Sequence, residues 1–119
     1  MLRKFGRSRD DALQDALDAA DKIAGWVDGK TFADYKADEY LRSAIERKFE
    51  IVSEALRIAA EQDETLRESL PRLGDVIGMR NAIAHGYFNV SNDVVWSAAT
   101  LFLPNLRQQI LLVLGNEGG

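Results

Sequence analysis

An arginine, an asparagine, a histidine and a tyrosine lie within eight residues of one another, as Arg80, Asn81, His85 and Tyr87. A histidine can act as general base or general acid, because its ordinary pKa lies near neutral pH. An arginine can hold a phosphate through two hydrogen bonds and stabilise its developing negative charge. An RNA strand carries its own nucleophile, the 2′-hydroxyl. The set therefore fits metal-free RNA cleavage, with the Asn81 amide and the Tyr87 phenol orienting sugar or phosphate.

His85 is the only histidine, and the chain has no cysteine. One chain can therefore supply only one of the two proton transfers, whereas a symmetric dimer with both motifs at one cleft would supply both. A metal site built from Cys and His is excluded, and no carboxylate cluster accompanies His85. The sequence contains no nucleophile elbow and no glycine-rich phosphate loop. We therefore expect neither a metal nor a cofactor.

Structural explanations compete with this chemistry. Arg80 falls inside the apolar stripe of a helix predicted over Pro71–Ala84, where Leu73 and Val76 form part of the buried face. Taken alone, an arginine there favours a snorkelling side chain or a structural ion pair. A lone histidine such as His85 is more often a helix-end cap or a satisfied buried group than a catalyst.

A second face of the same helix carries Gly74, Gly78, Asn81 and His85. Each glycine weakens a helix by about 1 kcal/mol relative to alanine, so a close approach would explain them. A neighbouring helix, a second subunit or a ligand backbone could make that approach. For the glycines alone, we expect a neighbouring helix.

Several helices must position this segment. Ser8 is a candidate N-cap, Thr31 and Asp34 form a candidate capping box, and Pro104 should kink or split the last helix. The polar stretch 63–70 is a short helix or a loop. Another helix is predicted to start at Thr31, with its stronger body over Asp38–Ala60. The remaining predicted helices are Asp10–Val27, Pro71–Ala84 and Val94–Leu114.

The chain has 119 residues, of which 46% are hydrophobic and 29% charged. These values predict a single domain over residues 1–119, with an ordered core over about residues 10–114. The fold class is all-α: an antiparallel bundle of four to five helices. A net charge of −4 disfavours a protein that coats long nucleic acids, but it leaves room for a small RNA site.

No export signal or membrane-spanning segment is visible, so we expect a cytoplasmic protein that does not engage a membrane. Four basic residues, Arg3, Lys4, Arg7 and Arg9, precede the first helix. They favour a solvated or frayed end over an RNA-binding arm.

The run Met79–Tyr87 resembles the R-x4-H-x-Y motif of the HepT-like toxins, which belong to the HEPN superfamily of helical-bundle ribonucleases. Ile77–Asn81 resembles the stretch that leads into this motif. Asp93–Trp96 and Leu103–Leu106 resemble the family's final helix. The similarity extends over Asp10–Leu114.

This resemblance implies a homodimeric, metal-independent endoribonuclease with Arg80 and His85 as catalytic pair and Asn81 in support. It implies the toxin of a type VII-like toxin–antitoxin pair that cleaves RNA, such as tRNA or mRNA, through 2′-hydroxyl attack. The implied partner is an MntA-like nucleotidyltransferase antitoxin, which transfers AMP from ATP to the motif's tyrosine, here Tyr87.

Two non-enzymatic alternatives remain open on the sequence. The bundle could be a non-catalytic interaction module that binds a nucleotidyltransferase partner. It could also be a helical dimer that binds a nucleotide without cleaving it.

Overall fold

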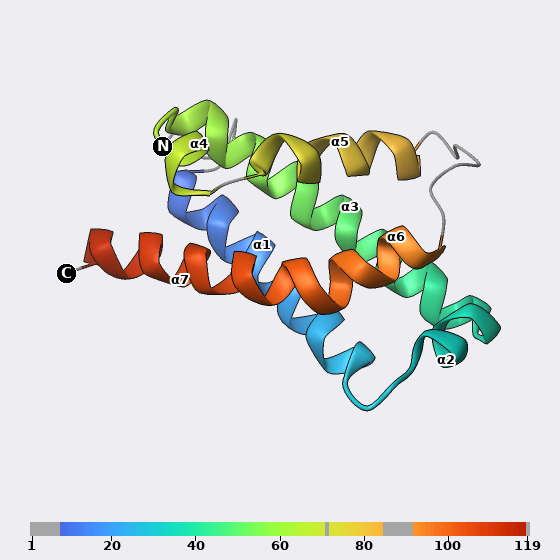
Figure 1. The fold of residues 1–119 in the computed structure, drawn as a ribbon. Helices are drawn as coiled ribbons and strands as arrows, with labels where there is room; N and C mark the ends of the chain where they lie inside the picture. The colour runs from blue at the N-terminus through green and yellow to red at the C-terminus, as the bar shows by residue number, and fades with distance from the viewer. Residues whose placement is uncertain (1–7, 71, 85–91, 119) are drawn as a thin grey trace.

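The computed structural model describes residues 8–70, 72–84 and 92–118, with the backbone alone at residues 79–84 and 116–118. Within these ranges every regular element is helical, which confirms the all-α class (Figure 1). The elements are α1 (Arg9–Val27), α2 (Phe32–Ala37), α3 (Glu39–Gln62), α4 (Leu66–Ser69), α5 (Leu73–Ala84), α6 (Asn92–Ser97), the π-helical segment η2 (Ala98–Phe102) and α7 (Leu103–Gly118).

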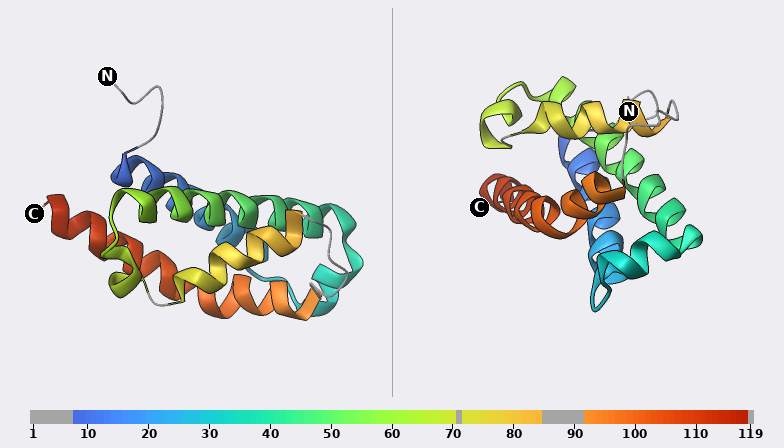
Figure 2. Two further views of the ribbon diagram at one scale, coloured as in Figure 1. Left: turned by 90° about the horizontal axis from the view of Figure 1, so that it is seen from above. Right: turned by 45° about the vertical axis from the view of Figure 1, so that its right-hand side comes forward.

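Helices α1 and α3 form the central pair of the bundle. α5 packs mainly on α3, and α7 packs on α1, so that α5 and the α6–η2–α7 segment lie on the same side of the pair (Figures 1 and 2). The apolar stripes that predict α1 and α3 are largely those that are buried. The fully or nearly fully buried members of both are Leu13, Leu17, Ala20, Ile45, Phe49, Val52, Leu56 and Ala59.

The predicted helix starts are also present. The Ser8 hydroxyl accepts a hydrogen bond from the Asp11 amide at 3.1 Å, which caps α1. Thr31 and Asp34 form the predicted capping box, with distances of 3.1 and 2.9 Å. That helix is the short α2, and α3 begins anew at the cap residue Asp38.

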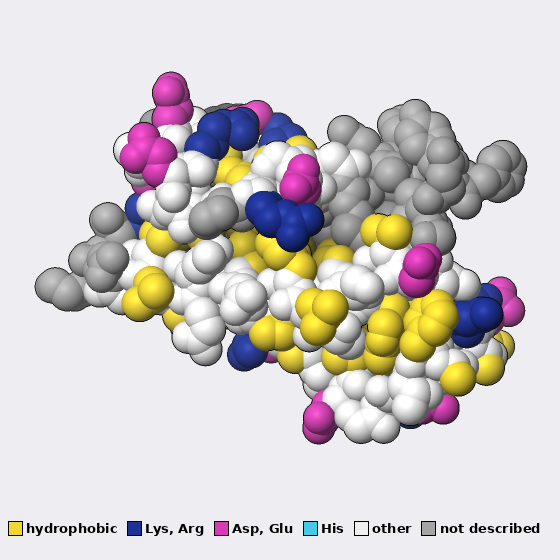
Figure 3. Space-filling view, in the orientation of Figure 1, with side chains coloured by type: hydrophobic (Ala, Val, Ile, Leu, Met, Phe, Trp, Pro, Cys, Tyr) yellow, Lys and Arg dark blue, Asp and Glu magenta, His cyan; other side chains and the backbone are white. Residues whose placement is uncertain are grey.

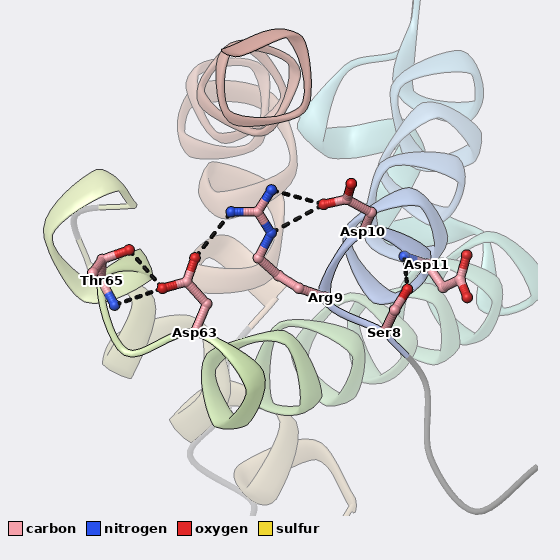
Figure 4. Close-up of polar contacts among 6 residues, drawn as sticks. All are labelled: Ser8, Arg9, Asp10, Asp11, Asp63 and Thr65. Atoms are coloured by element: carbon pink, nitrogen blue, oxygen red, sulfur yellow. Dashed lines mark hydrogen bonds and ion pairs between the residues drawn. The ribbon is translucent and has the colours of Figure 1, made fainter. Parts of the chain in front are cut away.

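Arg9 joins the beginning of α1 to the end of α3. Its guanidinium lies 2.9 Å from the Asp63 carboxylate and 2.7 Å from Asp10, and its side chain is only 15% exposed (Figure 4). Asp63 also accepts hydrogen bonds from the Thr65 amide and hydroxyl. Arg9 is therefore part of the folded bundle and not of a solvated end. Arg3, Lys4 and Arg7 lie outside the described residues.

The helix predicted from Pro71 begins later than expected. α5 starts at Leu73, after Arg72, whose φ of 68° lies in the left-handed region. The Arg72 carbonyl accepts the amides of Asp75 and Val76 at 3.0 and 3.2 Å. A left-handed residue cannot continue a right-handed helix, so the helix begins after Arg72. Pro71 itself lies outside the described residues.

Pro104 splits the last helix, as predicted. The amide of Leu103 bonds to the carbonyl of Ala98, five residues earlier, which makes η2 a π-helical segment between α6 and α7. Proline has no amide hydrogen to give to the preceding turn, so a local change of helix type before it is a common solution. Gly86, which suits the end of the helix predicted over Pro71–Ala84, lies outside the described residues. In the described part of the chain, no helix is both long enough and apolar enough to cross a membrane.

Candidate functional site

Helix α5 carries the first part of the predicted site. The structure places Arg80 and Asn81 near the carboxyl end of α5, which finishes at Ala84. His85 and Tyr87 lie outside the described residues, so their predicted roles remain predictions. In Figure 1, α5 ends on the side of the bundle where α6 begins and where α2 lies.

The first half of α5 anchors the helix to the core. Leu73 and Val76 are buried, and Ile77 is half-buried against the core. The Ser53 hydroxyl, from α3, donates a hydrogen bond to the Val76 carbonyl at 2.7 Å. The sequence interpretation missed Ser53. The sequence feature that could have revealed Ser53 is a polar residue next to the apolar stripe of α3, between Val52 and Ala55.

A second contact fastens the beginning of α5 to η2. The Arg72 guanidinium lies 5.1 Å from the centre of the Phe102 ring, within the range of a cation–π interaction. Arg72 also pairs with Asp75 at 3.2 Å. Both side chains of that ion pair are mostly exposed, so solvent screening makes it weak.

The glycines of α5 do not face a neighbouring helix, which corrects the expectation for Gly74 and Gly78. A methyl group added at either glycine would meet no described atom within 4 Å. A neighbouring helix of the described bundle therefore does not explain these two residues. Of the three partners that the sequence suggested for a close approach to these glycines, a second subunit and a ligand backbone remain.

An aromatic cluster holds α2 against α6. The Tyr35 ring is fully buried and lies 5.4 Å from the Trp96 ring, centre to centre, and Phe32 lies on the same indole at 6.5 Å. Burial, and then the nearby Glu46 carboxylate, raise the pKa of Tyr35 to about 12. Among the described residues, the Tyr35 hydroxyl has no hydrogen-bond partner. The sequence interpretation did not identify this cluster.

Glu46, on α3, is an acidic neighbour of that cluster. Burial is the largest cause that raises the pKa of its carboxyl group, and Glu50 adds to the effect while Arg42 opposes it.

In the described residues, no group of three or more His, Asp or Glu side chains is placed to hold a metal ion.

A groove between α1 and α3 is a poor candidate for RNA. Its floor is apolar, with Ala19, Ile51, Ala55 and Ile58. The charged residues on its rim are of both signs: Asp15, Asp18, Lys22, Arg47, Lys48, Glu50 and Glu54. Because four of these seven are acidic, the groove offers no positive field for a phosphate backbone. Helix α5 therefore remains the candidate site.

The comparison with known protein families covers most of the chain. Residues 16–113 match the family described as "Ribonuclease HepT-like", and this range contains the whole of Arg80–Tyr87. The chain is 27% identical over 105 residues to a protein of Caldanaerobacter subterraneus subsp. tengcongensis named "Putative RNase", covering 88% of this chain and 93% of the relative.

Two further relatives, both archaeal, are also named as ribonucleases. The chain is 28% identical over 101 residues to the "Probable ribonuclease HepT" of Thermococcus cleftensis, covering 85% of this chain and 91% of that protein. It is 23% identical over 103 residues to an RNase-named protein of Methanocaldococcus jannaschii, covering 85% and 92%. No solved structure matches the chain.

Proposed function

Since the chain belongs to the HepT-like ribonuclease family, we propose that it is a metal-independent endoribonuclease whose active centre forms around Arg80 and His85. The observation that carries the proposal is the family match, which spans residues 16–113 and includes the complete motif. The helix that bears Arg80 and Asn81 is part of the folded bundle, since Leu73, Val76 and Ile77 of the same α5 pack on the core.

The proposed reaction is an internal transfer at phosphorus. The 2′-oxygen of one nucleotide attacks the adjacent phosphate, the bond to the 5′-oxygen of the next nucleotide breaks, and a 2′,3′-cyclic phosphate and a 5′-hydroxyl result. A histidine takes the proton from the 2′-hydroxyl, and an acid returns one to the departing 5′-oxygen. Arg80 would hold the non-bridging oxygens as negative charge builds on them, with Asn81 in support.

A homodimer would complete the proton transfers. One chain has a single histidine, so His85 of one copy would act as base and His85 of the other as acid. No described atom from another part of the chain covers Gly74 and Gly78 of α5, which is consistent with a second copy or the RNA backbone approaching there. In this arrangement both motifs line one cleft.

Regulation by a nucleotidyltransferase antitoxin is the second part of the proposal. The Tyr87 hydroxyl would attack the α-phosphate of ATP, forming a tyrosyl–AMP ester and releasing pyrophosphate. The added phosphate brings negative charge and bulk next to the RNA phosphate site, which would repel the substrate. The protein would then be the toxin of a cytoplasmic toxin–antitoxin pair acting on tRNA or mRNA. The resemblance of Met79–Tyr87 to the motif of the HepT-like toxins supports this role.

The deciding experiment compares the wild type with Arg80→Ala and His85→Ala on RNA in the presence of EDTA. We expect the wild type to leave 2′,3′-cyclic phosphate ends, and both variants to lose cleavage while their helical circular dichroism is unchanged. Cleavage that requires added magnesium would contradict the metal-free mechanism. A wild type that binds a nucleotidyltransferase or a nucleotide without cutting RNA would support the non-catalytic alternative.

A further inference from the structure

Ser53 is a polar residue in an apolar interface. Apart from the aromatic Tyr35, it is the one fully buried side chain with a polar group in the part of the chain described, and it lies on α3 where α5 packs. A buried hydroxyl is costly unless it is hydrogen-bonded, and Ser53 meets this requirement through the Val76 carbonyl at 2.7 Å. The hydrogen bond therefore fixes one particular turn of α5 against α3.

That turn leads directly to Arg80. In an α-helix the carbonyl of one residue accepts the amide of the residue four positions later. Because α5 is α-helical from Leu73 to Ala84, the Val76 carbonyl is also the acceptor for the Arg80 amide. A carbonyl oxygen has two lone pairs and can accept both bonds. The Ser53 hydroxyl is thus separated from the Arg80 backbone by a single carbonyl oxygen.

The other described contacts of α5 constrain its position less sharply. Leu73, Val76 and Ile77 make apolar contacts, which are not directional and permit small rotations or slides. Arg72 contacts Phe102 and forms an exposed ion pair with Asp75, but these contacts act on the residue before α5 and on its first turn. A hydrogen bond of 2.7 Å, in contrast, depends steeply on distance and angle.

We propose that Ser53 is a positioning residue for Arg80. Through the Val76 carbonyl it sets the rotation and the axial position of the turn that carries Arg80, and so sets where the guanidinium meets the scissile phosphate. The inference rests on the proposed ribonuclease function for its catalytic consequence. Its structural step, the link from Ser53 to the Arg80 backbone, can be measured without RNA.

The test uses the full chain with Ser53→Ala, Ser53→Thr and Ser53→Cys. Alanine removes the hydroxyl, threonine retains it, and cysteine retains volume with a much weaker donor. Ile110→Val, in the buried face of α7, is the control for a general loss of packing. Two quantities are measured: the amide resonance of Arg80 by NMR, and kcat and KM on single-stranded RNA at a temperature where circular dichroism shows every variant folded.

We expect Ser53→Ala to move the Arg80 amide resonance and to lower kcat between about tenfold and a hundredfold, with little change in KM, as misplacement of a catalytic group does. Ser53→Cys should follow alanine, and Ser53→Thr should restore both quantities. Ile110→Val should change neither.

Three results would overturn the proposal: an unmoved Arg80 amide in Ser53→Ala, full kcat in that variant of an active enzyme, or an equal loss in Ile110→Val. If Ser53→Thr does not fold, the Arg80 amide resonance and the kcat of Ser53→Cys, each compared with wild type, decide the question instead. A wild type without ribonuclease activity would refute the proposed function, whereas the amide resonance would still decide whether Ser53 controls the Arg80 turn.

Discussion

The Arg72 guanidinium lies over the Phe102 ring, 5.1 Å from its centre, and thereby joins the residue before α5 to the π-helical segment η2. The two residues come from parts of the chain that are adjacent only in the folded bundle. The same residue has a φ of 68°, a conformation that residues with a side chain rarely adopt. Two opposing contributions therefore meet at one residue: a stabilising contact and an unfavourable backbone.

Substitutions at Arg72 should separate these contributions. Arg72→Ala loses the contact and keeps the unfavourable backbone, so its free energy of unfolding should fall by about 1 kcal/mol, the size of an exposed cation–π pair. Arg72→Gly loses the same contact but relieves the backbone, so it should be more stable than the alanine variant by about 1 kcal/mol. Urea denaturation measures both. A glycine variant no more stable than the alanine variant would contradict the assignment of strain.

Leu56 tests the core beneath the candidate site. Its side chain is fully buried in the stripe of α3, so Leu56→Ala should leave a cavity and lower the free energy of unfolding by about 2–5 kcal/mol. Tyr40→Ala is the control, because Tyr40 is 88% exposed and its loss should change stability by less than about 0.5 kcal/mol. Both are measured by denaturant unfolding followed by circular dichroism. Similar losses in the two variants would show that the described core is wrong.

The hydroxyl of Tyr35 is expected to cost stability. It is buried and no described residue forms a hydrogen bond with it, whereas the ring packs on Trp96. Tyr35→Phe keeps the ring and removes the unpaired group, so the free energy of unfolding should rise by about 1 kcal/mol. Thermal unfolding provides the measurement. A lower Tm in Tyr35→Phe would mean that the hydroxyl makes a favourable contact.

Asp63 should contribute a pH-dependent part of stability. Hydrogen bonds from Thr65 and Arg9 hold the pKa of its carboxyl group below the ordinary 3.8. A carboxyl whose pKa is lowered by folding stabilises the fold above its unfolded pKa, and this contribution disappears as the pH falls through the folded pKa. Asp63→Asn should therefore be less stable than wild type at pH 7, and the two should converge at strongly acidic pH. Unfolding curves across this pH range test the prediction, and a pH-independent difference would contradict it.

Tyr87 is the predicted acceptor of AMP. Tyr87→Phe removes the attacking hydroxyl, so a cognate nucleotidyltransferase with labelled ATP should transfer no label to that site, while the circular dichroism of the variant stays that of wild type. Tyr40→Phe, at an exposed tyrosine elsewhere, should be labelled like the wild type. Undiminished labelling of Tyr87→Phe would refute Tyr87 as the acceptor.

Local patterns were sufficient to predict most of the helices. The stripes of α1 and α3, the cap at Ser8 and the capping box of Thr31 are determined by residues close together in the sequence. They also placed Arg80 and Asn81 on one helix, which the structure bears out for the backbone of α5.

Contacts between distant segments could not be predicted in this way. The Ser53–Val76 hydrogen bond depends on how α3 and α5 face each other, which periodicity does not specify. The left-handed Arg72 delays α5 although Pro71 suits a first helical turn, because nothing in the sequence there marks a non-glycine residue for that conformation. Gly74 suggested a packed helix face, yet a methyl group there would meet none of the described neighbouring atoms within 4 Å.

The π-helical turn at Ala98–Phe102 also determines how the chain can change in length. A turn closed over five residues holds one residue more than an α-helical turn, and its most exposed side chain, Leu101, lies away from the core. Deleting one residue there would let the turn close as an ordinary α-helix, with Val95 before it and Leu106 after it still directed at α1 and its neighbours. The same deletion inside α3 would rotate the following half of that helix by about 100° and expose its buried stripe. Natural shortening of this bundle is therefore best tolerated immediately before Pro104.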